Sequence, residues 1–165
     1  IIVVVDDRRR GLAVPVAGGQ PVVVVETTAP TLTDEFHFSP DGRWVAYNSD
    51  ESGRHEVYIA PFGPAGERWQ VSIGGGVQGR WRGDGRELYY LSLDGTLMVV
   101  QIGAGSPPQL GTPKALFKTG LVPTWNTDHY AVAADGQRFL LELPVEGQEQ
   151  SPITVVLNWP AALKK

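Results

Sequence analysis

A strand–turn–strand segment that occurs three times constrains the fold of this chain more than any other feature. Its turns lie 43 and 51 residues apart, at Asp41-Gly42, Asp84-Gly85 and Asp135-Gly136. In such turns the Asp side chain accepts backbone hydrogen bonds and Gly takes a positive φ. The interval leaves room for two further strands, and four strands in about 45 residues are typical of a propeller blade. A β-sandwich is not expected to repeat one hairpin at this period.

Between these turns the apolar segments are short, rich in β-branched and aromatic residues, and bounded by Gly, Pro, Asp or Asn. This pattern predicts an all-β fold with antiparallel strands. The 20 Gly and 13 Pro residues among 165 supply the many turns that such a fold needs. The predicted strands are 1–5, 12–16, 22–26, 36–39, 44–49, 56–61, 68–72, 79–82, 87–92, 97–102, 114–118, 129–133, 138–143 and 153–157.

Large aromatic side chains recur on the predicted strands, where they are expected to fill the space between neighbouring sheets. The residues are Trp44, Tyr47, Tyr58, Phe62, Trp69, Trp81, Tyr89, Tyr90 and Phe139.

Composition and motifs exclude several function classes. Fourteen Lys and Arg against 18 Asp and Glu give a net charge of −4, which disfavours nucleic-acid binding. With no Cys, the chain has no disulfide, thiol nucleophile or cysteine-bound zinc. It contains none of the kinase catalytic strings and no G-x-S-x-G nucleophile elbow. No catalytic residue is predicted, and no membrane contact is expected from this segment, because its apolar runs are too short to span a bilayer.

Two short motifs suggest a bound group on first inspection. Residues 74–79 match G-x-G-x-x-G, but a hairpin follows them where a nucleotide site needs a helix, so we predict an inter-blade loop. Residues 48–53 resemble the start of a calcium loop, yet its twelfth position is Ile59 and not Glu. A hairpin loop is the simpler interpretation, and the sequence leaves calcium open. His37, His55 and His129 lack zinc-site spacing, and no cofactor or metal is predicted.

The repeat also carries a family resemblance. Residues 38–47, with 56–59 after them, resemble the WD40-like repeat of TolB-type β-propellers. Residues 52–62, 69–76, 111–117 and 151–159 resemble the C-terminal propeller of bacterial membrane-anchored serine/threonine kinases. The repeat departs from the family pattern at Arg82-Gly83 and Ala133-Ala134, where Ser-Pro is usual. The resemblance implies a propeller fold and an extracytoplasmic location, periplasmic or at the cell surface.

With the propeller template, residues 1–165 form a single propeller segment with two complete and two partial four-stranded blades. The expected blades are 1–28 (partial), 33–75, 77–120 and 125–165 (partial), with the first strand of each complete blade innermost. Because both ends are incomplete, we expect the segment to be part of a six- or seven-bladed ring. Its open blade faces favour pairing with a second copy, which makes a homodimer the structural alternative.

Loops that lead into the innermost strands cluster around the mouth of a propeller's central channel, and here they carry polar residues at equivalent places. The sequence therefore predicts a non-catalytic module that binds a protein, peptide or glycan at this mouth. The alternative function is part of a propeller hydrolase or lyase whose active site lies in other blades or another domain. The candidate binding residues are Asp34, Glu35, Gln78, Arg80, Asn126, Asp128 and His129.

Overall fold

The computed structural model describes residues 2–5, 9–28, 30–63, 66–125 and 127–143, and side chains from residue 9 onward. Throughout these ranges the regular structure is antiparallel β-sheet, so the predicted all-β fold is confirmed. No helix in them is long and apolar enough to cross a membrane. The predicted strand 153–157 lies outside the described residues.

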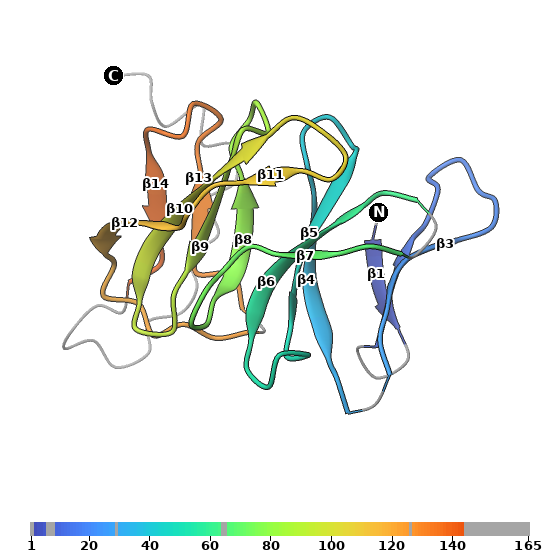
Figure 1. Cartoon of the computed structure of the whole chain (residues 1–165), viewed down its shortest axis with the longest axis horizontal. Helices are drawn as coiled ribbons and strands as arrows, with labels where there is room; N and C mark the ends of the chain where they lie inside the picture. The colour runs from blue at the N-terminus through green and yellow to red at the C-terminus, as the bar shows by residue number, and fades with distance from the viewer. Residues whose placement is uncertain (1, 6–8, 29, 64–65, 126, 144–165) are drawn as a thin grey trace, which may run out of the picture.

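Four sheets follow one another along the long axis of the molecule in chain order (Figure 1). The first has the order β1-β2-β3 and the second β4-β5-β6-β7; the third runs β8-β9-β10, and the fourth pairs β13 with β14. The first two sheets comprise β1 (Ile2–Val5), β2 (Arg10–Ala13), β3 (Val22–Glu26), β4 (Thr33–Phe38), β5 (Trp44–Ser49), β6 (Glu56–Pro61) and β7 (Trp69–Gln70). The others comprise β8 (Val77–Trp81), β9 (Glu87–Leu91), β10 (Thr96–Gly103), β11 (Gln109–Leu110), β12 (Lys114–Lys118), β13 (Tyr130–Val132) and β14 (Phe139–Leu141).

The third sheet has one strand more than a four-stranded blade. Both β11 and β12 pair with the long strand β10, at different parts of its length. The sequence pattern missed β11 because it contains only the two residues Gln109 and Leu110, too few for any alternation to be visible.

Side chains between the sheets form three apolar clusters, one at each junction. Ala13, Val24 and Val25 meet Tyr47 and Ala60 at the first. The second joins Ala46, Val57 and Ile59 to Leu88, Tyr90 and Val100, and the third joins Tyr89, Leu91 and Leu97 to Tyr130. Every residue of β5 is buried, because β5 has a sheet on each face. Most of the predicted aromatic residues lie in these layers, but Phe62 is 43% exposed, since it follows the last residue of β6.

The Asp-Gly turns at 41, 84 and 135 have one geometry. Asp41 Oδ1 accepts the backbone N–H of Arg43. In the same way, Asp84 accepts the N–H of Arg86, and Asp135 accepts the N–H of Gln137. The glycines that follow have φ of 71°, 72° and 69°. The same arrangement recurs at Asp94-Gly95, where the N–H of Thr96 donates to Asp94 and φ is 78°.

Hairpins of neighbouring sheets touch at these turns. The N–H of Gly83 donates to the carbonyl of Ala134 at 3.0 Å, so the third and fourth sheets share a hydrogen bond outside their own ladders. A Cβ at Gly83 would lie 2.7 Å from that carbonyl oxygen, which is backbone and has little freedom to move.

We expect Gly83→Ala to lower the free energy of unfolding by about 1–3 kcal/mol, because the added methyl group forces the two hairpins apart. Urea denaturation checks this. Gly63→Ala is the matched control, since a Cβ there meets no atom within 4 Å. Equal stability of the two variants would contradict the contact between the hairpins.

Candidate functional site

The predicted binding residues converge because β8 lies against β4, β5 and β13. Asp34 and Glu35 lie on β4, Gln78 and Arg80 on β8, and Asp128 and His129 immediately before β13. The structure brings these six residues together at one end of the stacked sheets. Asn126 lies outside the described residues.

In the second and third sheets, the first strand is irregular near its start, and this irregularity shapes the end of the sheets where the site lies. The register of β4 against β5 shifts between Asp34 and His37, and that of β8 against β9 shifts between Val77 and Arg80. Glu35 and Gln78 occupy equivalent positions in these bulges, with φ of 52° and 61°. Both strands therefore begin earlier than predicted, at Thr33 and not 36 and at Val77 and not 79. Side chains that resemble loop residues in the sequence lie on bulged strands instead.

Gln78 connects three sheets through hydrogen bonds. Its N–H donates to Asn48 Oδ1 at 3.1 Å, and its carbonyl accepts the hydroxyl of Tyr130 at 2.7 Å. Its side chain donates to the carbonyl of Thr124 at 2.9 Å and accepts the N–H of His129 at 3.0 Å. The side chain is fully buried, so Gln78 positions its neighbours and is not itself presented to solvent.

Glu35 is a buried carboxyl. Its side chain is 9% exposed, and neither carboxyl oxygen accepts a hydrogen bond from the part of the chain that the structure describes. Arg80 Nη1 lies 3.8 Å from Oε2. The pKa of Glu35 is raised to about 8, mainly by burial. The positive charge of Arg80 opposes this shift, the carboxylates of Asp128 and Asp34 add to it, and the Asn48 side chain opposes it weakly. Glu35 is therefore mostly protonated at neutral pH.

Arg80 links the buried carboxyl to the surface. Its guanidinium forms an ion pair with Asp128 and donates to the carbonyl of Gly79 at 3.0 Å. It also lies over the ring of Tyr130, 5.8 Å from the centroid. The Arg80 side chain is 11% exposed whereas that of Asp128 is 65% exposed. Asp128 is thus the residue of this group that an incoming molecule meets first.

Asn48 belongs to the site although the sequence indicated it only as part of a loop. Its Nδ2 donates to Asp34 Oδ1 at 3.0 Å, while its Oδ1 accepts from Gln78. Two other oxygens of the segment that resembles a calcium loop accept backbone N–H groups: Asp50 Oδ1 accepts from Leu32 at 2.8 Å and Ser49 Oγ accepts from Glu51 at 3.3 Å. These contacts support the hairpin interpretation of residues 48–53.

Two histidines border the cluster. The pKa of His37 is lowered to about 4, mainly by burial and in addition by the positive charge of Arg80, which together outweigh the opposing effect of Asp128. The Nε2 atom of His129 lies 2.9 Å from Thr124 Oγ1. Sequence reasoning gave no site role to His37, Thr124 or Tyr130, because their involvement depends on contacts between sheets.

In the glycine-rich segment 74–79, residues 74–76 form a loop between the second and third sheets, whereas residues 77–79 already belong to β8, so the predicted loop ends earlier than expected. Buried Glu56 fixes it: Oε1 accepts the N–H of Gly75 at 2.8 Å and Oε2 accepts the Ser72 hydroxyl. Ser72 Oγ in turn accepts the N–H of Val57 at 2.7 Å. Gly75 has a φ of 107°, and a Cβ there would lie 2.4 Å from Leu93.

A cleft of about 440 Å³ adjoins the polar cluster. Arg80, Asp128, His129 and Tyr130 form one side of it, and Leu140, Leu141 and Glu142 contribute from β14 and the residue that follows. The polar cluster thus combines three carboxyl groups, those of Asp34, Glu35 and Asp128, with the single guanidinium of Arg80.

Comparisons with known proteins add the following. Neither the protein-family models nor the sequences of curated proteins gave a match to the chain. Among solved structures, the chain is similar to the crystal structure of TolB from Acinetobacter baumannii, with a TM-score of 0.47 and 19% sequence identity. The match covers 78% of this chain and 33% of that one, so this chain spans about a third of the length of its structural neighbour.

The two shifted pKa values predict how stability depends on pH. Because the folded pKa of Glu35 is raised to about 8, stability falls as pH rises from about 4.5 to 8. Because that of His37 is lowered from 6.5 to about 4, stability falls as pH drops through this range. The two effects oppose each other below pH 6.5, and of the two only Glu35 acts between 6.5 and 8.

We therefore expect Glu35→Gln to flatten the loss of stability between pH 6.5 and 8, measured as the free energy of unfolding in urea. The exposed Glu67 supplies a matched control, since Glu67→Gln also removes one carboxylate. In this variant the loss of stability between pH 6.5 and 8 should remain that of the wild type. An unchanged pH slope in Glu35→Gln would show that this carboxyl does not hold its proton in the folded state.

Proposed function

We propose that this chain is a non-catalytic binding module, and that the polar cluster binds a basic side chain of a peptide or protein partner. The observation that carries this proposal is the row of ionisable side chains from exposed Asp128 through Arg80 to buried Glu35. Of the partner classes predicted from sequence, this arrangement favours protein or peptide over glycan, since its outermost group is a charged carboxylate and not an aromatic surface.

The charges suggest how such a group is accepted. Arg80 pairs with Asp128 and lies 3.8 Å from Glu35, beyond hydrogen-bond distance. A lysine or arginine that pairs with Asp128 competes with Arg80, whose guanidinium then approaches Glu35. The closer positive charge favours the ionised form of Glu35, so binding releases a proton. The ionised Glu35 thus neutralises the charge of Arg80 while Asp128 pairs with the partner.

The resemblance in sequence extends this proposal to the parent protein. We propose that the chain forms the C-terminal, extracytoplasmic part of a receptor-type serine/threonine kinase, where its rigid sheets hold the binding residues in place. The support is the sequence strings around residues 52–62 and 151–159. A Gly-rich loop and a His-Arg-Asp string encoded upstream in the same gene would support this context, and their absence would contradict it.

Titration with two short blocked peptides, one with a central lysine and one with glutamine in its place, tests the binding function by NMR. We expect the lysine peptide to shift resonances of Asp128, His129 and Tyr130, and Asp128→Asn to weaken its binding about two- to five-fold. Added salt lowers the affinity. Glu67→Gln is the control for loss of one exposed carboxylate. Equal binding of both peptides, or full affinity in Asp128→Asn, would contradict the proposal.

We also propose that two copies associate through the outer face of the β13–β14 sheet. Ala131 and Leu140 are register partners on this sheet and both are exposed, Leu140 to 75%. Burial of such an apolar pair against a second copy stabilises a dimer.

Sedimentation of the purified chain should therefore give about twice 17.9 kDa. Leu140→Lys should shift the population to monomer, because a charged group in the buried face lacks a partner. Leu116→Lys, at a comparably apolar exposed position on β12, should leave the mass unchanged. A wild-type monomer at all concentrations would refute the association.

A further inference from the structure

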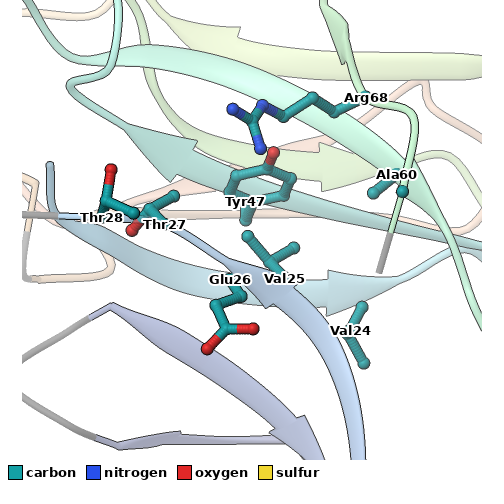
Figure 2. Close-up of a pocket in the computed structure, with 9 residues that line it drawn as sticks. Val24, Val25, Glu26, Thr27, Thr28, Tyr47, Ala60 and Arg68 are labelled. Carbon is teal, nitrogen blue, oxygen red and sulfur yellow. The ribbon is translucent and has the colours of Figure 1, made fainter. Parts of the chain in front are cut away.

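Two cavities of the molecule differ in the polar groups that they offer to a partner. In the cavity of about 340 Å³ between the first two sheets, the Tyr47 hydroxyl is buried and Arg68 is already paired with Glu51 (Figure 2). In the cleft of about 440 Å³ beside the polar cluster, Glu142 is exposed and forms no ion pair with any residue that the structure describes. The cleft therefore presents a charge that a partner can use.

The charged side chains that line the cleft favour a basic group. Arg80 and Asp128 form an ion pair with each other, so Glu142 adds a carboxylate whose charge is not compensated. A lysine or arginine can pair with Glu142 without displacing Arg80 from Asp128. Glu142 is therefore a second carboxylate for the basic side chain of the proposed partner.

Glu142 and Leu140 lie on the same face of the β13–β14 sheet. Side chains alternate along β14, and the N–H of Glu142 donates to the carbonyl of His129 at 2.9 Å, so the pairing of the two strands continues through this residue. Leu140 is 75% exposed, and its register partner Ala131 is also exposed. Glu142, Leu140 and Ala131 all line the cleft. Along this face a carboxylate is thus followed by an apolar pair.

The spacing of these groups matches that of an extended peptide. Residues two positions apart in a strand are separated by about 6.6 Å, and the side chains on one side of a bound extended segment have the same spacing. When a basic side chain pairs with Glu142, the side chain two positions away therefore reaches Ala131 and Leu140. An apolar side chain at that place is favoured, because it removes exposed apolar surface from water.

We propose that the cleft binds an extended peptide segment in which a basic residue and an apolar residue are two positions apart. The inference rests on the proposed function, since it takes the basic group from there and adds its neighbour. Asp128 and Glu142 contact the basic side chain, and Ala131 and Leu140 contact the apolar one. Because Ala131 and Leu140 also form the contact proposed between two copies, the peptide and a second copy compete for them.

Four blocked peptides test the proposal, with Lys-Ala-Leu, Lys-Ala-Ser, Lys-Leu-Ala or Gln-Ala-Leu at the centre of one common sequence. Each is also made in the reverse order, because the spacing is the same in both chain directions. They are titrated by NMR into the full chain, at a concentration at which sedimentation shows the monomer. In the order that binds better, Lys-Ala-Leu should bind about three- to ten-fold more tightly than Lys-Ala-Ser. It should exceed Lys-Leu-Ala by a similar factor, because that peptide carries leucine on the opposite side of an extended chain.

Two variants assign the contacts. Leu140→Ala should remove the preference for Lys-Ala-Leu over Lys-Ala-Ser and leave the affinity for Lys-Ala-Ser unchanged. Glu142→Gln should weaken the binding of both lysine peptides about two- to five-fold. The matched controls are Leu116→Ala and Glu67→Gln, at exposed residues that do not line the cleft, and both should bind the peptides as the wild type does.

The possible results separate this inference from the proposed function. Equal binding of Lys-Ala-Leu, Lys-Ala-Ser and Lys-Leu-Ala, all tighter than Gln-Ala-Leu, would overturn the inference and leave the binding of a basic group in place. Equal binding of Gln-Ala-Leu and Lys-Ala-Leu, or no saturable shift with any peptide, would overturn both. A preference for leucine that persists in Leu140→Ala would overturn the inference alone, because the apolar side chain then binds elsewhere.

Discussion

Face-to-face packing of twisted sheets is the constraint on which the rest of this structure depends. A sheet with an apolar layer on each side, such as the one that contains β5, is stable only between two neighbours. Small residues set how closely the sheets approach. A Cβ at Gly79 would lie 2.9 Å from Val57, and one at Gly11 would lie 2.5 Å from the ring of Phe36. The distance between neighbouring sheets therefore depends on side-chain volume at their junctions.

Close packing of the sheets places polar groups in contact at one end. Once β8 lies between β4 and β13, Gln78 has partners from both sides, and Arg80 lies between the carboxyls of Glu35 and Asp128. The bulges at Glu35 and Gln78 turn the following residues relative to a regular strand. The same packing that excludes water from the apolar clusters also buries Glu35, and its acid–base properties follow from that burial.

The sequence was sufficient for the fold because the features that specify it are local. Asp41-Gly42 and its two counterparts carry the turn chemistry in adjacent residues, and the short continuous apolar runs of β5 and β6 mark buried strands directly. The sequence was also sufficient to select six residues that the structure brings together. It did not distinguish Gln78, which is fully buried, from Asp128, which is exposed, because that difference arises from the opposing sheet.

Features that depend on contacts between sheets were not predictable in the same way. In the sequence, Asn48 resembled a calcium-ligating residue of a loop. In the structure its Oδ1 accepts the N–H of Gln78, 30 positions away. The buried hydroxyl of Tyr47, which makes no hydrogen bond within the described residues, gave no sequence signal, since the lack of a partner is a property of its surroundings. The two-residue strand β11 is too short for a pattern.

Short outer strands have a consequence for behaviour at high concentration. A sheet edge with a long row of free N–H and C=O groups is a template on which other chains add as strands and aggregate. Here the second sheet ends on β7 and one branch of the third on β11, and each of these strands has only two residues. The longer outer strand β12 begins and ends with an exposed lysine, Lys114 and Lys118, whose charges repel an incoming copy. The sheet edges formed by β7, β11 and β12 are thus protected against growth into fibres by strand addition.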